Sequence, residues 1–290
     1  MNEPLNAKHA AALRTLMDDP SPSVRAAVER EIIRYGSQAV DMLVEVVETE
    51  TSGSDQSELA LALLERLDVH QPERDLIRFI RSQEYELESG LVFIERVLNP
   101  DFDAVKFQMQ LNDLAARCRE LMAIPSSSHA ISSVISRVLN HEYGFRLDGI
   151  QSEALESISI HSVLESKRGD SFALALCYLL VAERIGFELL VIDNPLRGVL
   201  GYFQGVEPFY LDAGAGWAVR SLEELHQMIN ASGMTPDLEH FAPIPVSAYL
   251  SDYCSRIGLA LFKEGRLEES ALFHDFEREF LETHRKSTSM

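Results

Sequence analysis

The sequence predicts an α+β protein that is mostly helical and has a small antiparallel sheet in its middle. Three observations support this class. Apolar residues recur at helical spacing through most of the 290 residues, one central helix is almost wholly apolar, and three short strand-like runs follow it. We expect helical repeats over 1–100, the α+β core over 101–235 and a helical pair over 236–290.

The first third of the chain has the pattern of short helical repeats. A turn rich in Asp and Pro at 18–22 precedes Ser23, the expected cap, and apolar residues at helical spacing continue to Gly36. The unit Asp-Pro-x-x-x-Val-Arg…Gly resembles a HEAT-type repeat, and we expect a short array because evenly spaced copies are few. The polar segment 48–57 is expected to be an exposed loop. Further helices are expected at 40–47, 59–67 and 76–79.

The centre of the chain is predicted from one helix and the runs that follow it. Asp170 and Ser171 open an almost wholly apolar helix, 172–185, which Gly186 ends. A helix that is apolar on every side is buried, so this helix is expected at the centre of the core. Strands are expected at 189–192, 199–203 and 209–211.

Helices are expected on both sides of this centre. Helical stripes run from 87 to 143, with a break at 125–128, and Gly144 is expected to end the last of them in the left-handed conformation. After Trp217 the chain returns to helices, and the last two, joined at 263–265, resemble a tetratricopeptide-style pair. These later helices are expected at 222–229, 248–262 and 268–280.

The charge balance limits the classes of partner. Lys and Arg number 26 against 46 Asp and Glu, so the formal net charge is −20. A field of this sign repels phosphate backbones and anionic lipids, so we expect no nucleic-acid and no membrane partner. The longest apolar run, 172–182, is too short to span a bilayer. The acidity is expected mainly to keep the protein soluble, and among partners a protein with a basic surface is the easiest to accept.

The cysteines indicate a reducing, cytoplasmic environment. Cys118, Cys177 and Cys254 are far apart and form no C-x-x-C pair, and the N-terminus has no signal-peptide pattern. All three fall in helical patterns, where buried small hydrophobic side chains are expected. Neither metal-ligand spacing nor a phosphate-binding loop is present, so no metal and no cofactor are expected.

A buried helix followed by a small antiparallel sheet is the layout of papain-like and transglutaminase-like cores. Four segments resemble, in order and spacing, the bacterial SirB-type family of transglutaminase-like proteins. They are His-Glu-Tyr-Gly-Phe-Arg at 141–146, Val-Leu-Glu-x-x-Arg-Gly at 163–169, the spaced Leu, Ala, Tyr, Arg and Gly of 174–186, and Tyr-Leu-Asp at 210–212. The resemblance covers most of the chain, and it implies an α+β core and, for most family members, no established reaction.

The resemblance also implies where a catalytic triad would lie. In such cores a Cys at the start of the central helix acts with a His and an Asp on the strands. The matching positions here are Ser171, Arg197 and Asp212. Arg197 takes the His position because Pro-Leu-Arg-Gly at 195–198 stands where relatives usually carry Pro-Gly-His-Phe. An Arg stays protonated at physiological pH and cannot act as a base. Cys177, further along the helix, is expected to point away from Ser171.

Three functions are compatible with these residues. The first is a non-enzymatic protein-interaction or regulatory module built on a degenerate core. The second is a hydrolase or acyltransferase with a rearranged site that uses Ser171 or His161. The third is small-molecule or peptide binding in the former active-site cleft, with Arg197 holding a carboxylate. An exposed Ser171 hydroxyl with a His nitrogen in reach favours an enzyme, and a buried one favours the module.

A hairpin register is the most specific prediction from this part of the sequence. If Gln204-Gly205 is a two-residue turn, Arg197 lies opposite Asp212 on the neighbouring strand and forms a structural ion pair with it. Pro208 cannot donate to the strand ladder, so a bulge beside it would shift this register by one residue.

Overall fold

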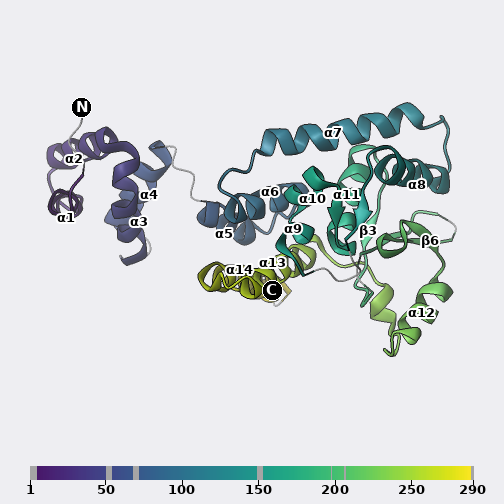
Figure 1. Ribbon diagram of the computed structural model, residues 1–290. Coiled ribbons are helices and arrows are strands. Elements are labelled where there is room, and N and C mark those ends of the chain that lie inside the picture. Colours follow the sequence, from purple (N-terminus) through teal and green to yellow (C-terminus); the bar gives the residue numbers. More distant parts are fainter. Residues whose placement is uncertain are drawn as a thin grey trace. The chain divides into compact units, whose positions relative to one another are not determined.

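A computed structural model describes residues 5–49, 54–67, 72–148, 153–196, 198–205 and 207–288 (Figure 1). The chain divides into two compact units, Met1–Gln71 and Pro72–Met290. It is mostly helical with a small antiparallel sheet, which confirms the predicted class. Among the described helices, none is both long and apolar enough to cross a membrane.

The first unit consists of short helices around their own core, in which Ile32, Leu43 and Leu63 are fully buried. The second helix, Pro22–Tyr35, confirms the predicted repeat helix. It begins at Pro22 rather than after Ser23, because the first position of a helix favours Pro. The next residue after this helix, Gly36, has φ +60°. The helices are α1 Ala7–Leu16, α2 Pro22–Tyr35, α3 Val40–Thr49 and α4 Asp55–Arg66, with a 3₁₀ turn at Gly36–Ala39.

The predicted loop over 48–57 is shorter than expected. Helix α3 continues through Thr49, and α4 begins at Asp55, whose acidic side chain favours the first turn of a helix. Ser57, inside α4, is buried rather than exposed. Residues 50–53 lie outside the described part of the chain.

The second unit begins with the helices that surround its centre. They are α5 Pro72–Ser82, α6 Leu87–Leu98, α7 Ala104–Leu121, α8 Ser128–Arg137 with a π-helical turn at Val138–Glu142, α9 Leu155–Ile158 and α10 Ile160–Ser166. The predicted break before Ser128 is present, and Gly144 ends the π turn with φ +78° as predicted. Helices α5 and α6, which the sequence analysis placed with the N-terminal repeats, pack in this unit against α14 and α13.

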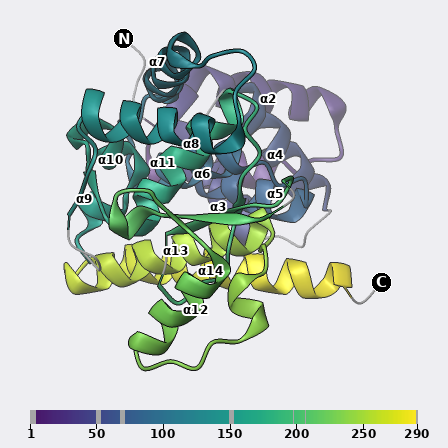
Figure 2. The same cartoon turned by 90° about the vertical axis from the view of Figure 1, so that its right-hand side faces the viewer.

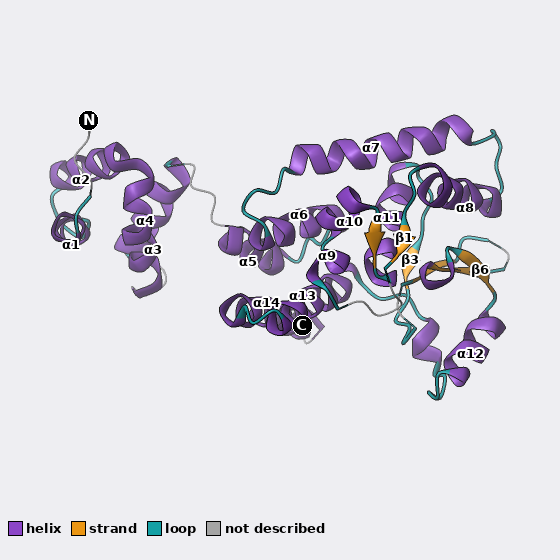
Figure 3. Cartoon of the chain, viewed as in Figure 1, coloured by secondary structure: helices purple, strands orange, loops and turns teal. Residues whose placement is uncertain are grey.

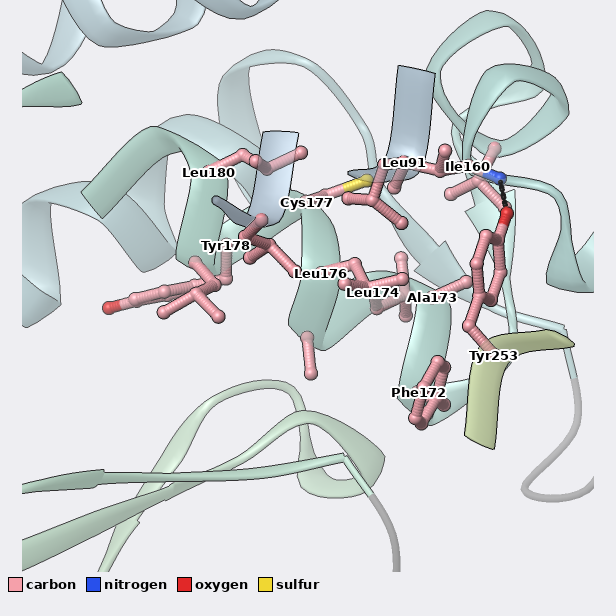
Figure 4. Close-up of a cluster of buried hydrophobic side chains, with 14 of the residues drawn as sticks. Leu91, Ile160, Phe172, Ala173, Leu174, Leu176, Cys177, Tyr178, Leu180 and Tyr253 are labelled. Atoms are coloured by element: carbon pink, nitrogen blue, oxygen red, sulfur yellow. Dashed lines mark hydrogen bonds between the residues drawn. The ribbon is translucent and has the colours of Figure 1, made fainter. Parts of the chain in front are cut away.

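Helix α11, Ser171–Arg184, occupies the centre of the second unit, as predicted. Its side chains from Ser171 to Ala182 are all buried, and Figure 4 shows Leu176 and Tyr178 among the apolar side chains around it. The side chain of Asp170 caps the helix by accepting a hydrogen bond from Ala173 N at 2.8 Å. Gly186 follows the helix with φ +73°. A helix buried on all sides holds its N-terminus at a defined place in the core.

The antiparallel sheet has the strand order β3-β4-β5-β6, and Figure 3 shows its strands in orange. The predicted strands appear as β3 Leu190–Val191, β4 Val199–Tyr202 and β5 Phe209–Asp212. Strand β6, Ala218–Arg220, was not predicted, because three residues carry too little periodicity to separate a strand from a loop. Two further short strands, β1 Arg146–Leu147 and β2 Arg168–Gly169, pair in parallel.

The predicted hairpin register is wrong. Tyr202 pairs with Phe209 and Val199 pairs with Asp212, so the β4–β5 connection is longer than a two-residue turn. In this register the next pair would be Phe203 and Pro208, and Pro208 has no N–H to donate to the ladder. The ladder therefore ends before the expected turn. Asp212 lies opposite Val199, and Arg197 lies outside the described residues.

The C-terminal segment confirms the predicted helices with α12 Leu222–Ala231, α13 Val246–Lys263 and α14 Leu267–Thr288. Helices α13 and α14 lie side by side, as Figure 2 also shows. Gly258 permits this close approach, because a Cβ there would lie 3.1 Å from the His274 ring. Ser270 Oγ donates to Gly258 O at 2.8 Å across the pair. Helix α13 also contacts α6 and α9, which ties it to the core.

Candidate functional site

The start of α11 is the position at which the family resemblance places a nucleophile. Ser171 is the first residue of the helix and only 2 % exposed. The neighbouring Asp170 is buried and forms an ion pair with Arg256 of α13. Helix α13 therefore contacts the start of α11.

Gly198 covers Ser171 from the β3–β4 connection. Its φ is +66°, and a Cβ at this position would lie 2.6 Å from the carbonyl carbon of Ser171 and 2.9 Å from its Cβ. Only glycine combines this backbone conformation with so close an approach. The connection consequently closes over the helix start. Gly198 thus lies against the backbone and Cβ of Ser171, a residue that is itself buried.

Asp212, the expected acid, is held by groups other than a histidine. It is 6 % exposed at the end of β5, and its Oδ1 accepts a hydrogen bond from Ala215 N at 3.2 Å. Its Oδ2 lies 3.6 Å from Nε of Arg220 on β6. The carboxylate thus caps a tight turn and has a basic partner on the neighbouring strand. The register that placed Arg197 opposite Asp212 is wrong, so the expected pair has lost its basis, and Arg197 itself lies outside the described residues.

The three thiols share an environment that disfavours the thiolate. Cys118, Cys177 and Cys254 are all buried, as predicted. Burial raises the pKa of Cys118 to about 11 and that of Cys177 to about 12, and it raises the pKa of Cys254 further. The thiolate is the reactive form, so these side chains are unreactive near neutral pH.

His161 contacts residues other than those at the start of α11. On α10 its ring meets the Phe102 ring edge-on at 5.4 Å between centroids, and its Nε2 lies 3.7 Å from Oε2 of Glu165. Among the residues that the structure describes, no histidine hydrogen-bonds to Ser171 or Asp212. The same part of the chain contains no group of three or more His, Cys, Asp or Glu side chains arranged to hold a metal.

A cavity of about 350 Å³ opens beside the start of α11. Its walls come from α11, the β3–β4 connection and α13, and they include Phe172, Gly198 and Tyr249. Sequence reasoning missed the contribution of α13. The available signal was the spacing of Tyr249, Asp252 and Arg256, which places three polar side chains on one side of a largely apolar helix.

A sequence model of the transglutaminase-like superfamily matches residues 105–251, half of the chain. The chain belongs to the transglutaminase-like superfamily. No curated protein matches the chain, and no solved structure does. The matched segment of this transglutaminase-like protein runs from α7 into α13, so it contains Ser171, Gly198, Asp212 and Tyr249. The N-terminal repeats and most of the C-terminal pair lie outside the match, and their HEAT-like and tetratricopeptide-like character stays a prediction.

Proposed function

We propose that this transglutaminase-like protein is a non-enzymatic protein-interaction module of SirB type. One observation carries the proposal. The residue at the start of α11 is Ser171 rather than Cys, and it is buried beneath the backbone of Gly198. A nucleophile must reach its substrate, and Ser171 is only 2 % exposed, with the β3–β4 connection lying against its backbone and Cβ.

The chemistry around Ser171 also supports a loss of acyl transfer. A serine hydroxyl becomes a useful nucleophile only beside a general base. Arg197, at the expected histidine position, cannot be that base because a guanidinium stays protonated. Asp212 is occupied by Ala215 N and by Arg220, and His161 contacts Phe102 and Glu165 instead.

The charge and the helical architecture support a protein partner. With a net charge of −20, the protein would associate fastest with a basic surface, because long-range attraction raises the rate of encounter. Short helical arrays present extended surfaces, which suits contacts with another protein. The proposal also places the protein in the cytoplasm of a bacterium, where buried free thiols stay reduced.

The absence of a working nucleophile is tested with two reactive probes on the folded, full-length protein. Iodoacetamide should leave the three cysteines unmodified, as measured by intact mass, and should modify all three after unfolding in guanidinium. A fluorophosphonate, which labels activated serines, should not label Ser171. Rapid labelling of Ser171, lost in Ser171→Ala, would show that the protein is an enzyme.

The interaction itself is tested by comparing two proteins that differ at the helix start. Affinity capture with wild type and with Ser171→Ala should recover the same partner. Once purified, this partner should bind the two proteins with the same Kd. A module predicts this equality because Ser171 is buried. A partner that binds wild type transiently and Ser171→Ala persistently would behave as a substrate and contradict the proposal.

A further inference from the structure

A separate cavity of about 400 Å³ is lined by residues at the start of α6, at the end of α11 and in the turn after it, and at the start of α13. We call it the α6–α11 cavity. Its apolar walls include Leu87, Leu179, Phe187 and Val246. Leu179 and Phe187 are only 8 % and 4 % exposed, so they form its deeper part. A cavity of this size is at the small end of ligand pockets and suits one side chain of a partner.

Three carboxylates, those of Glu86, Glu183 and Glu188, also line the α6–α11 cavity. All three residues are exposed, so their charges lie toward solvent above the apolar walls. Glu86 accepts a hydrogen bond from Ser89 N at 2.9 Å, and Glu188 accepts one from the side-chain amide of Gln204. These donors are neutral, and they leave the negative charge of the two carboxylates in place.

Glu183 is the carboxylate with the least favourable surroundings. It lies in the last turn of α11, where the carbonyl groups carry partial negative charge and a basic residue would be favoured. Partial burial raises its pKa above the usual value, Glu86 and Glu88 raise it further, and Arg184 only partly opposes them. Among the described residues, the Glu183 carboxylate makes no hydrogen bond and no ion pair. Negative charge is therefore in excess at this point.

The neighbouring Arg184 is engaged elsewhere. Its Nη2 lies 2.6 Å from Oε2 of Glu88, its Nε donates to Oδ1 of Asn112 at 3.1 Å, and its Nη1 donates to Leu180 O at 3.1 Å. All three guanidinium nitrogens thus contact groups outside the lining of the α6–α11 cavity. By stability alone, a neutral glutamine at position 183 would serve as well as glutamate or better. A glutamate here is expected if its charge meets a cation that comes from outside the chain.

We propose that the α6–α11 cavity binds a basic side chain of the protein partner, with its apolar stem on Leu179 and Phe187 and its cationic head beside Glu183 and Glu188. The inference rests on the proposed function and deepens it by naming the chemistry of the partner. Leu179 and Glu183 are one turn apart on α11, so an apolar surface lies next to a carboxylate. Lysine and arginine carry an apolar stem and a charged head in this order.

The experiment titrates the full-length protein, labelled with ¹⁵N, with three probes and follows the amide signals of 85–89 and 183–190 by NMR. The probes are N-acetyl-arginine amide, N-acetyl-lysine amide and the neutral N-acetyl-norleucine amide. We expect saturable shifts with the two basic probes and none with the norleucine probe. Added salt should weaken the binding, because ions screen the exposed carboxylates.

Two variants and one matched control locate the site. Glu183→Gln should weaken binding of the arginine probe by about threefold, in line with an exposed ion pair, and adding Glu188→Gln should bring the loss to about tenfold. Glu156→Gln makes the same change at an exposed residue that does not line this cavity, and it should leave the affinity unchanged. The melting temperature of Glu183→Gln should equal or exceed that of wild type, which excludes unfolding as the cause.

Binding should also change the titration of the Glu183 carboxyl group. A cation beside this group favours its charged form, so its pKa, measured by ¹³C NMR, should fall when the arginine probe saturates the protein. The norleucine probe should leave the pKa of Glu183 unchanged. An unchanged pKa with the arginine probe bound would place that probe elsewhere on the surface and overturn the proposal.

The remaining outcomes separate the inference from the function on which it rests. No saturable binding of either basic probe, or full affinity in the double variant, would overturn the basic-side-chain site and leave the non-enzymatic module in place. Fluorophosphonate labelling of Ser171 would overturn the module whichever probe binds.

Discussion

The hydroxyl of Tyr253 on α13 donates a hydrogen bond to Oε1 of Glu95 on α6, at 2.5 Å, inside the core of the second unit. Glu95 is fully buried, and it also accepts from Ile160 N at 2.9 Å and from Ser159 Oγ at 3.0 Å. Figure 4 shows the further contact of Tyr253 with Ile160 N, at 2.8 Å. One carboxyl group therefore joins α6, α10 and α13, and it holds the C-terminal pair onto the core.

The two buried tyrosines of α13 should respond in opposite ways to loss of the hydroxyl. Tyr253→Phe leaves Glu95 with one donor fewer and should lower the free energy of unfolding by about 1–3 kcal/mol. Tyr249→Phe removes a hydroxyl that has no described partner and should be neutral or stabilising. Urea denaturation of both variants measures the difference. Equal destabilisation would show that the Tyr249 hydroxyl has a structural role.

Glu95 should make the protein less stable as pH rises. Burial raises the pKa of Glu95 above its usual value, although hydrogen bonds from Tyr253 and Ser159 partly oppose this. The folded state therefore binds more protons at this site than the unfolded state does, so the site's contribution to stability is complete below the unfolded pKa. That contribution is lost as pH rises toward the folded pKa.

Glu95→Gln isolates this effect because it removes the titration and keeps the shape of the side chain. The stability of wild type relative to Glu95→Gln should fall as pH rises from about 4 to 7. Denaturation midpoints at several pH values provide the measurement. A constant difference across this range would mean that the carboxyl has no perturbed pKa.

Gly198→Ala should be much more harmful than the same change at another glycine of positive φ. At Gly198 a methyl group meets the backbone of Ser171, and the combined strain and overpacking should lower stability by about 2–4 kcal/mol. Gly186 has a similar φ, +73°, but no atom lies within 4 Å of a Cβ there. Gly186→Ala should therefore lower stability by only about 1 kcal/mol, which thermal or chemical unfolding can resolve. Similar losses at the two sites would argue against the close contact.

Breaking the buried pair between Asp170 and Arg256 should destabilise the start of α11. Burial lowers the pKa of Arg256 to about 10, and the guanidinium lies over the Phe172 ring at 4.7 Å. Arg256→Met leaves Asp170 charged and buried, so a loss of about 3–5 kcal/mol is expected. Asp170→Asn in the same chain should recover part of this loss, because Asn still caps the helix.

A double-mutant cycle supplies the measurement, with an exposed pair as the control. Arg278→Met, which breaks the exposed pair with Asp275, should change stability by less than about 1 kcal/mol. If Asp170→Asn gave no recovery in Arg256→Met, the two side chains would not be coupled, and packing of Arg256 on Phe172 would explain the loss.

Local patterns were enough to predict most of the elements. The apolar run after Ser171 predicted a buried helix, and Gly186 predicted its end, because these signals depend only on residues a few positions apart. Ser171 begins the central helix and Asp212 ends a strand. That these are triad positions, as the resemblance implies, stays a prediction.

The sequence by itself determined the class of the protein and the central helix with Ser171 at its start. Only the tertiary structure decided the register and the surroundings of the site. Strand β4 pairs Val199 with Asp212, Gly198 lies against Ser171, and Tyr249 contributes to the cavity wall from a helix far along the chain. Each of these depends on contacts between residues distant in sequence, and the periodicity of a single segment contains no information about such contacts.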